Sequence, residues 1–599
     1  MIKERERGIL RNKGLTAMEA KLKVNEEYIR MFILCIYAIS LLIISISVFI
    51  ELSPWLVTPF AVVVTFFLPG YVMLGILKLK IGPLAELVSA FLLSYLGDVP
   101  ILLLAKALPV NPKVAFTFIY LPLFFIVTFF SLKKHVKNEH VIVDLNRLIM
   151  FIITLSMMCI SLSLLYPDML KVSNLDIVRH YRNAVNYAEN LDYYKSIYPL
   201  FYIPESIVIL WTGASSAVLN TTLSFLSLLL PISYYLFVKE IVDDSEIAAL
   251  SSLLFITFSG FGWLLLVRRL VLGVPLSEAV RGLAEKTYWD IGYGMTAYIW
   301  LWFRPMTVGM IGFFITLSLL SRQEKTVPFI LIVLAFTHLP ELVFTIFLIF
   351  IFSIFSNKYD KLFLKIKNKI LLILLIISLL YCLRYFIPIS KDTWYMKTKI
   401  TILLLFTLII IQSFLHKFLY NILYIKIRKR INILKFRLIN IFSYLLILLM
   451  SIYLGIITWW IVNPDIFSLK ESVGRYIYEV PIYMYPVLLG LTPVLSLLSL
   501  VKVKFNKEFI LFITASLFFL LLAKTIVIVY LVFFTVFYFE RRIITLIFIT
   551  LLPLTALYIK NLLSKKGLLY KLILLLIVAA GGISTFLTVS YWYIGLRLL

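Results

Sequence analysis

Charged residues are scarce in this sequence. Asp, Glu, Lys and Arg together make up 15% of its 599 residues, against about 25% in a typical soluble domain. Hydrophobic residues make up 62%, and the mean hydropathy is +1.01. A water-soluble fold of this length needs a charged surface that the chain cannot supply. We therefore expect an all-α polytopic membrane protein, with lipid as the solvent for most of its surface.

Cysteine is also scarce and follows no chemical pattern. Cys35, Cys159 and Cys382 all lie within apolar stretches, and their spacing fits neither a zinc site nor a disulfide framework. The sequence also lacks a Walker A loop, a Gly-x-Ser-x-Gly turn, a His-Glu-x-x-His pair and a dinucleotide-type glycine fingerprint. These absences exclude an ATP-driven pump with its own motor and the commonest serine and zinc hydrolases.

Positive charge is abundant, with a formal net charge of +26, but it is dispersed. Basic residues occur in short tracts between apolar runs, as at Lys133 and Lys134, at 426–430, and at Lys565 and Lys566. A nucleic-acid-binding protein would gather them on a polar domain of its own. Short basic tracts are typical of the cytoplasmic loops of membrane proteins. We expect a multi-pass protein of the cell membrane and no nucleic-acid partner.

Apolar runs of about 20 residues, the length that spans a bilayer as a helix, recur about 14–17 times along the chain. We divide the chain into a basic cytoplasmic tail at 1–30, a four-helix membrane module at 31–146, a membrane core at 147–416, a basic cytoplasmic linker at 417–439 and C-terminal membrane helices at 440–599. With the tail inside, the basic 133–147 loop falls inside, and the polar 167–199 and 462–483 loops are assigned outside. Lys239 and the Arg268–Arg269 pair favour opposite orientations of the middle spans, whose topology stays open.

The 167–199 loop contains a segment with helical periodicity. One face of a helix would carry Asp176, Arg179, His180, Asn183 and Tyr187, and the other face would carry the more apolar Ile177, Tyr181, Ala184, Val185 and Ala188. This pattern predicts an amphipathic helix lying in the membrane interface. Asp176 and His180 are four residues apart and share a face, so they could act as a general base or hold a metal. Alternatively, Ser173 and Asp176 form a capping-box-like pattern.

The order of segments after this loop resembles the GT-C superfamily of membrane glycosyltransferases. The loop leads into the segments 197–202 (IYPLFY) and 211–215 (WTGAS), and then into a helix ending at Glu240. Near the C-terminus, 538–542 (YFERR) and 551–557 (LLPLTAL) resemble the helix that closes many members of the superfamily. The resemblance covers roughly residues 147–590 and implies a GT-C-like bundle with amphipathic interfacial helices in its outer loops. The N-terminal module resembles uncharacterised archaeal membrane proteins.

The resemblance implies transfer of a sugar from a polyprenyl-phosphate carrier to a lipid or protein acceptor on the outer face. Asp176 would be the general base, with His180 assisting it. Members of the superfamily often carry a second acidic residue where this chain has Ile177, so a need for a divalent metal at Asp176 is left open. A guanidinium can bind a phosphate through two parallel hydrogen bonds. The candidate substrate-binding residues are Arg179, Arg304, His338, Glu341, Arg541 and Arg542.

Three of these candidates come from polar residues in apolar surroundings, which are costly and point to function by default. Arg304 precedes Pro305 at a predicted helix start, where it would bind phosphate or anchor the helix at the interface. His338 and Glu341 flank Pro340, which interrupts a long apolar run and would place them at a cavity mouth. Asp98 and Asp290 show no partner in the sequence.

Three other functions remain open at this stage. A transporter or flippase for lipid-linked saccharides would also need many helices and a cationic cavity. A ligase or polymerase of lipid-linked glycans would share the donor and differ in its acceptor. A non-catalytic membrane scaffold would need none of the polar residues singled out above.

Overall fold

The computed structural model describes residues 21–78, 81–133, 140–169, 176–190, 198–258, 303–320, 489–500 and 536–565, together with parts of 269–278, 325–349, 509–516 and 567–582. The expected spans near 369–387, 398–416 and 440–461, the 417–439 linker and the 462–483 loop lie outside the described residues.

Four long helices form the N-terminal module, as the sequence predicted. They are α2 (Glu26–Phe49), α3 (Pro54–Leu77), α4 (Pro83–Ala107) and α5 (Pro112–Lys133). Three of them begin at a proline, which is favoured in the first turn because its missing N–H would have no intrahelical partner there. Their bounds lie within a few residues of the expected spans, except that α2 begins five residues before its span near 31–50.

One short strand pair is the addition to the helices. Strand β1 (Lys21–Asn25) pairs antiparallel with β2 (His140–Asp144), Lys21 lying opposite Asp144 and Asn25 opposite His140. The pairing brings the end of the N-terminal tail against the loop between α5 and α6. These two segments therefore lie on the same side, as their basic character predicts.

The core and the C-terminal part continue as helices. Their order is α6 (Leu145–Met169), α7 (Asp176–Asn190), α8 (Pro199–Thr212), α9 (Ser216–Ser224), the 3-10 turn η1 (Phe225–Leu228), α10 (Leu229–Val242), α11 (Ser245–Thr257), α16 (Pro305–Leu319), α17 (Val327–Thr337), α23 (Thr492–Leu500) and α25 (Val536–Leu563). Helices α9, η1 and α10 follow one another without a break. They form one apolar span of the length expected near 217–238.

Among the described residues, six helices are long and apolar enough to cross a membrane: Tyr28–Phe49, Pro54–Leu77, Pro83–Ala107, Pro112–Ser131, Ser216–Val242 and Ile544–Leu563. Many apolar side chains on the first of these are exposed, including those of Phe32, Leu42 and Phe49. Exposed apolar side chains on long helices are stable only against lipid. The chain is an all-α polytopic membrane protein.

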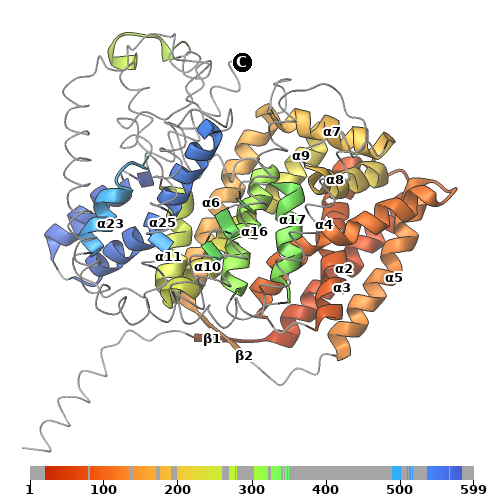
Figure 1. Cartoon of the computed structure of the whole chain (residues 1–599), viewed down its shortest axis with the longest axis horizontal. Helices are drawn as coiled ribbons and strands as arrows, with labels where there is room; N and C mark the ends of the chain where they lie inside the picture. Colours follow the sequence, from red (N-terminus) through yellow and green to blue (C-terminus); the bar gives the residue numbers. More distant parts are fainter. Residues whose placement is uncertain are drawn as a thin grey trace, which may run out of the picture.

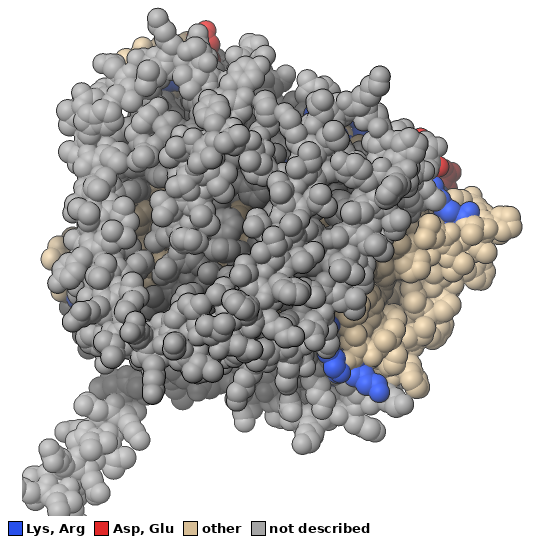
Figure 2. Space-filling model, in the orientation of Figure 1, with Lys and Arg blue, Asp and Glu red and all other residues tan. Residues whose placement is uncertain are grey.

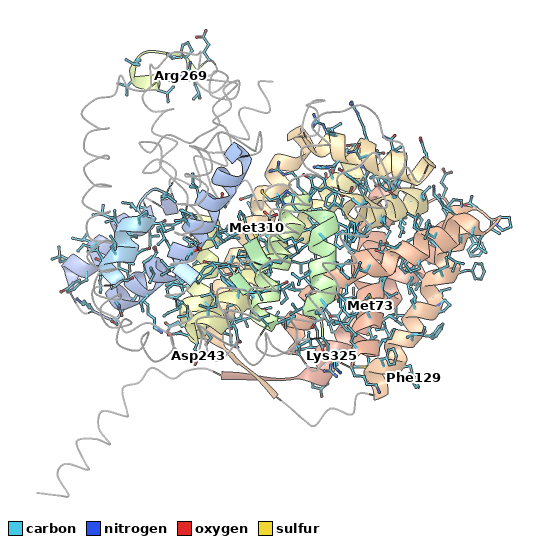
Figure 3. All side chains as sticks on the ribbon, viewed as in Figure 1. Met73, Phe129, Asp243, Arg269, Met310 and Lys325 are labelled. Carbon is cyan, nitrogen blue, oxygen red and sulfur yellow. The ribbon has the colours of Figure 1, made fainter. Side chains whose placement is uncertain are left out.

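The molecule has two distinct ends (Figure 1). Strands β1 and β2 lie at one end, and Asp243 and Lys325 lie at the same end (Figure 3). We call this the strand end. Helix α7 lies at the opposite end, which we call the α7 end, and Arg269 also lies away from the strands. This placement agrees with the prediction that the 167–199 loop and the basic tail lie on opposite sides.

The described surface that is visible in Figure 2 is mostly uncharged between the two ends. Figure 2 shows a tan face over α4 and α5, with basic side chains at its lower edge and charged side chains near its upper edge. This is the distribution expected of a surface whose middle faces hydrocarbon and whose edges meet the headgroups.

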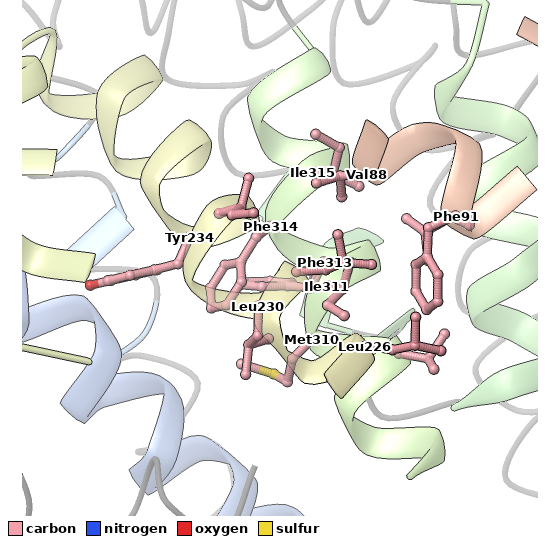
Figure 4. Close-up of a cluster of buried hydrophobic side chains, with 14 of the residues drawn as sticks. Val88, Phe91, Leu226, Leu230, Tyr234, Met310, Ile311, Phe313, Phe314 and Ile315 are labelled. Carbon is pink, nitrogen blue, oxygen red and sulfur yellow. The ribbon is translucent and has the colours of Figure 1, made fainter. Parts of the chain in front are cut away.

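A continuous apolar core joins the N-terminal module to the rest of the chain. Val88 and Phe91 of α4, Leu230 of α10 and Ile311 of α16 are all fully buried in one cluster (Figure 4). Tyr234 of α10 also belongs to this core, and its hydroxyl donates to the carbonyl of Ile549 in α25 at 2.6 Å. The site described below therefore rests on a packed scaffold.

Helices α11 and α25 are joined at the strand end through Asp244. One carboxylate oxygen of Asp244 accepts the backbone N–H groups of Glu246 and Ile247 at 2.9 and 3.0 Å and so caps α11. The other oxygen accepts from the Lys560 ammonium at 2.9 Å, which also pairs with Glu246 at 2.7 Å. Burial acts to raise the pKa of Asp244, but Lys560 and the backbone donors outweigh it, so the pKa is lowered.

Replacement of Asp244 by Ala should lower the free energy of unfolding by about 1 kcal/mol, the usual cost of losing such a cap. Because the pKa is lower in the folded state, the wild-type carboxylate stabilises the fold above about pH 4. This contribution is lost as the pH falls through the folded-state pKa. Thermal unfolding in detergent at neutral and acid pH would measure both effects. Glu246→Ala, which removes only an exposed partner of Lys560, should have the smaller effect; an equal loss would contradict the capping role.

Candidate functional site

Helix α7 is amphipathic, as expected, but the residues on its buried face differ from those that the sequence predicted. The buried stripe comprises His180, Ala184, Tyr187 and Ala188, whereas Arg179 is exposed. Helical periodicity predicted that His180 and Tyr187 lie on the polar face, and this prediction is wrong. The reason is that α7 packs on α8. An imidazole or a phenol can be buried where the neighbouring helix supplies a hydrogen-bond partner. The exposed position of Arg179 leaves its predicted role in substrate binding untested.

Four sets of hydrogen bonds hold α7 in place. The Ser206 hydroxyl of α8 donates to the carbonyl of Ala184 at 2.7 Å, and the Tyr181 hydroxyl donates to the carbonyl of Ala214 at 3.1 Å. Burial raises the pKa of Tyr181, so this hydroxyl stays a donor. Lys106 of α4 donates to the carbonyls of Tyr187 and Glu189 in the last turns of α7, at 3.4 and 3.3 Å. The last set centres on Tyr202.

Tyr202 of α8 joins the two polar residues of α7 that face it. Its hydroxyl lies 2.7 Å from Nδ1 of His180 and accepts from the Asn183 amide at 3.1 Å. With Asn183 donating to the oxygen, the Tyr202 proton is available to Nδ1. Tyr202 thereby orients the imidazole from the protein side.

The break after α17 reaches the same place. Helix α17 ends at Thr337, the backbone of His338 after it is extended, and Glu341 is again helical. The predicted interruption at His338–Glu341 is therefore confirmed. The imidazole of His338 contacts the carboxylate of Glu341, and both residues are buried. The Tyr198 ring lies 5.6 Å from that of His338 and 6.4 Å from that of His180, so one tyrosine stands between the two histidines.

The residue next to Arg304 packs against α8, the helix that carries Tyr202. Arg304 is the residue before α16, is 5% exposed, and its backbone N–H donates to the Thr307 hydroxyl at 3.3 Å. The adjacent Phe303 stacks on Phe201 of α8 at 5.9 Å. The predicted helix start at Arg304 is confirmed, and the residue is buried.

A close approach between α16 and the helix break depends on glycine. A Cβ built on Gly309 would lie 2.9 Å from Glu341 Oε2 and 3.0 Å from His338 Cβ. A larger residue would therefore push the His338–Glu341 pair away from α16. The remaining oxygen of that carboxylate, Oε1, is buried and has no hydrogen-bond partner among the described residues.

Helix α25 completes the group. Thr545 and Leu546 line a small cavity of about 10 Å³ with Glu341, and Met306 of α16 also contributes to its wall. This is roughly the space of one water molecule. Arg541, whose side chain lies outside the described part, comes one helical turn before Thr545. The structure thus brings the helices that carry Arg304, Glu341 and the Arg541–Arg542 pair together.

Arg541 and Arg542 lie far along α25 from the contact that this helix makes with Asp244. In the structure both arginines lie within α25, and it is Lys560 that pairs with Asp244 at the strand end. Arg541 is nineteen residues earlier in α25, about 29 Å away along the helix axis. The arginine pair therefore does not lie at the strand end.

Asp176 is the first residue of α7, and its side chain lies outside the described part, as does Ser173. Among the described residues, no group of three His, Cys, Asp or Glu could hold a metal ion. Tyr198, Tyr202 and Gly309 were missed as site residues. The aromatic and proline-rich run at 197–204 is the signal that could have pointed to the first two.

Replacement of Tyr202 by Phe is expected to loosen α7 by about 1–2 kcal/mol, because His180 and Asn183 both lose a buried partner. Hydrogen exchange of the α7 amides should accelerate by about tenfold, since each 1.4 kcal/mol is a factor of ten. Tyr234→Phe is a matched control because it removes an equally buried tyrosine hydroxyl that contacts α25 instead. Equal α7 exchange in both variants would show that Tyr202 does not hold the helix.

The chain was compared with family models, with curated proteins and with solved structures, and none of them matches it. The residues and their geometry must therefore carry the functional argument.

Proposed function

We propose that this protein is a glycosyltransferase of the cell membrane that moves a sugar from a polyprenyl-phosphate carrier to a lipid or protein acceptor on the outer face. The observation that carries the proposal is the placement of the Tyr198 ring near both His180 of α7 and the buried His338, with the buried Arg304 next to Phe303, which stacks on Phe201 of α8. Helix α25, which carries Arg541 and Arg542, borders the same site. The reaction needs a base beside the acceptor, which is the proposed role of Asp176 in α7, and cations beside the phosphate.

Each residue has a chemical role in this proposal. Asp176, at the start of α7, takes the proton of the acceptor hydroxyl or amide as its oxygen or nitrogen attacks the anomeric carbon. The bond from that carbon to the phosphate oxygen breaks, and the polyprenyl phosphate leaves with the electron pair. The configuration at the anomeric carbon inverts. His180, held by Tyr202, positions the acceptor beside Asp176.

The leaving phosphate carries negative charge that must be stabilised. Arg304 and the Arg541–Arg542 pair are proposed to bind it, since a guanidinium matches a phosphate with two parallel donors. A buried Arg304 is well suited because electrostatic attraction is stronger away from water. Glu341 keeps His338 oriented within the site through their direct contact.

The full-length protein in vesicles, supplied with a panel of labelled polyprenyl-phosphate sugars and a membrane extract as acceptor, would test the proposal. Transfer of label to a new lipid or protein product would support it. Movement of the intact labelled lipid across the bilayer, without transfer, would favour a transporter or flippase instead. Joining of whole glycans to one another would favour a ligase or polymerase. Either of these results would overturn the proposed reaction.

A further inference from the structure

An apolar groove lies on the N-terminal module between α3 and α5, which pack against each other. Helix α2 begins at β1 and α3 returns from its far end, while α5 leads to β2, so both groove helices end at the strand end. The groove has a volume of about 530 Å³, within the usual range of ligand pockets, which is about 300–1,000 Å³. Residues near the ends of the two helices line it: Val72, Ile76, Phe125, Ile126, Phe129 and Phe130.

The walls of the groove are entirely apolar, and several of them face outward. The side chains of Ile76, Phe125 and Phe129 are exposed, and Phe129 lies toward the strand end in Figure 3. The ring of Phe130 lies against Gly75 of α3, where a Cβ would come within 2.5 Å of the ring. A larger residue at position 75 would push this wall of the groove away from α3. An occupant of the groove must itself be apolar.

The size of the lining side chains favours a hydrocarbon chain over another helix. Transmembrane helices associate through small residues that let their backbones come close. The groove is lined instead by three phenylalanines, two isoleucines and a valine. The nearby Gly75 is covered by Phe130, so it offers no close approach to a second helix. A flexible chain of methylene groups fits between such side chains.

Positive charge lies where the groove reaches the strand end. Lys78 follows α3 directly, and its backbone N–H donates to the carbonyl of Gly75 at 3.1 Å. Its side chain is exposed, and α5 ends at another lysine, Lys133. Glu86, the acidic residue in the first turn of α4, pairs with Arg30 at 3.8 Å and so does not cancel this charge. Figure 2 shows basic side chains at the lower edge of the apolar face. Lysines at a membrane surface attract anionic headgroups.

We propose that the groove between α3 and α5 binds one hydrocarbon chain of a phospholipid with an anionic headgroup. The lipid comes from the leaflet at the strand end, which the basic tail and the 133–147 loop predict to be cytoplasmic. Its chain lies between Ile76 and Phe129, and its headgroup lies at Lys78. Because the lipid binds only where the two helices are packed, it stabilises the N-terminal module. The site is at the opposite end from α7 and independent of the proposed reaction.

A phosphatidylglycerol probe with a photoreactive diazirine in one chain tests the site in phosphatidylcholine vesicles that hold the full-length protein. Mass spectrometry should find the label concentrated at 72–76 and 125–130, and unlabelled phosphatidylglycerol should displace it. A phosphatidylcholine probe with the same chain should label the groove about fivefold less, since one lysine near a membrane surface strengthens the attachment of anionic lipid by about that factor.

Three variants separate the headgroup from the chain. Lys78→Gln should lower labelling by the anionic probe about fivefold. Lys113→Gln is the matched control, because Lys113 lies at the other end of α5, and it should leave the labelling unchanged. Ile76→Trp adds bulk at an exposed position on the groove wall and should lower labelling by both probes.

Three results would overturn the proposal, and all of them are obtained with the wild-type protein, so none depends on the folding of a variant. Equal labelling of the groove by the two probes would show that the headgroup is not recognised. Labelling no denser in the groove than on the exposed face of α2 would show that there is no site. Displacement by polyprenyl phosphate and not by phosphatidylglycerol would assign the groove to the other lipid. None of these measurements depends on sugar transfer.

Discussion

Replacement of Asp176 by Asn is expected to lower the rate of sugar transfer by about 10²–10⁴-fold, the usual contribution of a general base. Asn is close to Asp in shape and supports a helix start about as well, so α7 should still begin at this residue. The substitution removes the group that takes the acceptor proton. It leaves the contacts of His180 with Tyr202 in place.

The variant and the wild-type protein would be assayed side by side in vesicles with the donor that supports transfer. Glu189→Gln provides the control, because Glu189 is an exposed carboxylate near the other end of the same helix, and its loss should leave the rate unchanged. Hydrogen exchange of the α7 amides would establish that the helix is intact. Equal rates for Asp176→Asn and wild type would mean that Asp176 serves the helix terminus and not the reaction.

Replacement of Gly70 by Ala should cause one of the largest losses of stability in the N-terminal module. A Cβ at Gly70 would lie 1.8 Å from the carbonyl oxygen of Ala90 in α4, which is backbone and cannot rotate away. Helices α3 and α4 would have to separate, and the bond from the Gly70 N–H to the Ser94 hydroxyl, 2.9 Å long, would stretch. We expect a loss of roughly 3 kcal/mol or more, at the upper end of overpacking costs.

Thermal unfolding of the purified protein in detergent measures this loss. Gly82→Ala is the matched control because nothing lies within 4 Å of the Cβ it would gain. Gly82 also has a φ of −66°, which alanine adopts without strain. A similar melting temperature for both variants would show that α3 and α4 can part at Gly70 without cost.

The membrane class and most element positions followed from composition and run length. Apolar runs of spanning length become helices because the bilayer offers no partner for backbone polar groups. The N-terminal spans, the break near Pro340 and the helix start at Arg304 were all predicted within a few residues. Two spans differed: α11 ends at Thr257 although its span was expected to continue to 267. Helix α25 begins at Val536 although its span was expected from 543, so it includes the arginine pair. The start of α25 was missed because the charged residues at 540–542 lower the local hydropathy and make the apolar run seem to begin after them.

The contacts within the candidate site could not be predicted from sequence patterns. His180 and His338 were both singled out, but nothing in the sequence says that Tyr198 stands between them. Periodicity separates polar from apolar residues, and it placed His180 on the polar face of α7. Burial of His180 depends on the Tyr202 hydroxyl, which comes from another helix. Such pairing is visible only in three dimensions.

The amino-acid sequence by itself determined three things: that this protein is a membrane protein, which segments form helices, and which polar residues are costly to place in a membrane. These properties depend on local composition, because the bilayer favours apolar helices and penalises polar side chains residue by residue. The tertiary structure alone decided which of those residues meet. It joined α7 to α8 through Tyr202, placed Glu341 against α25, and set Asp98 beside Tyr120. Contacts between distant segments depend on how helices pack, and packing is a property of the whole fold.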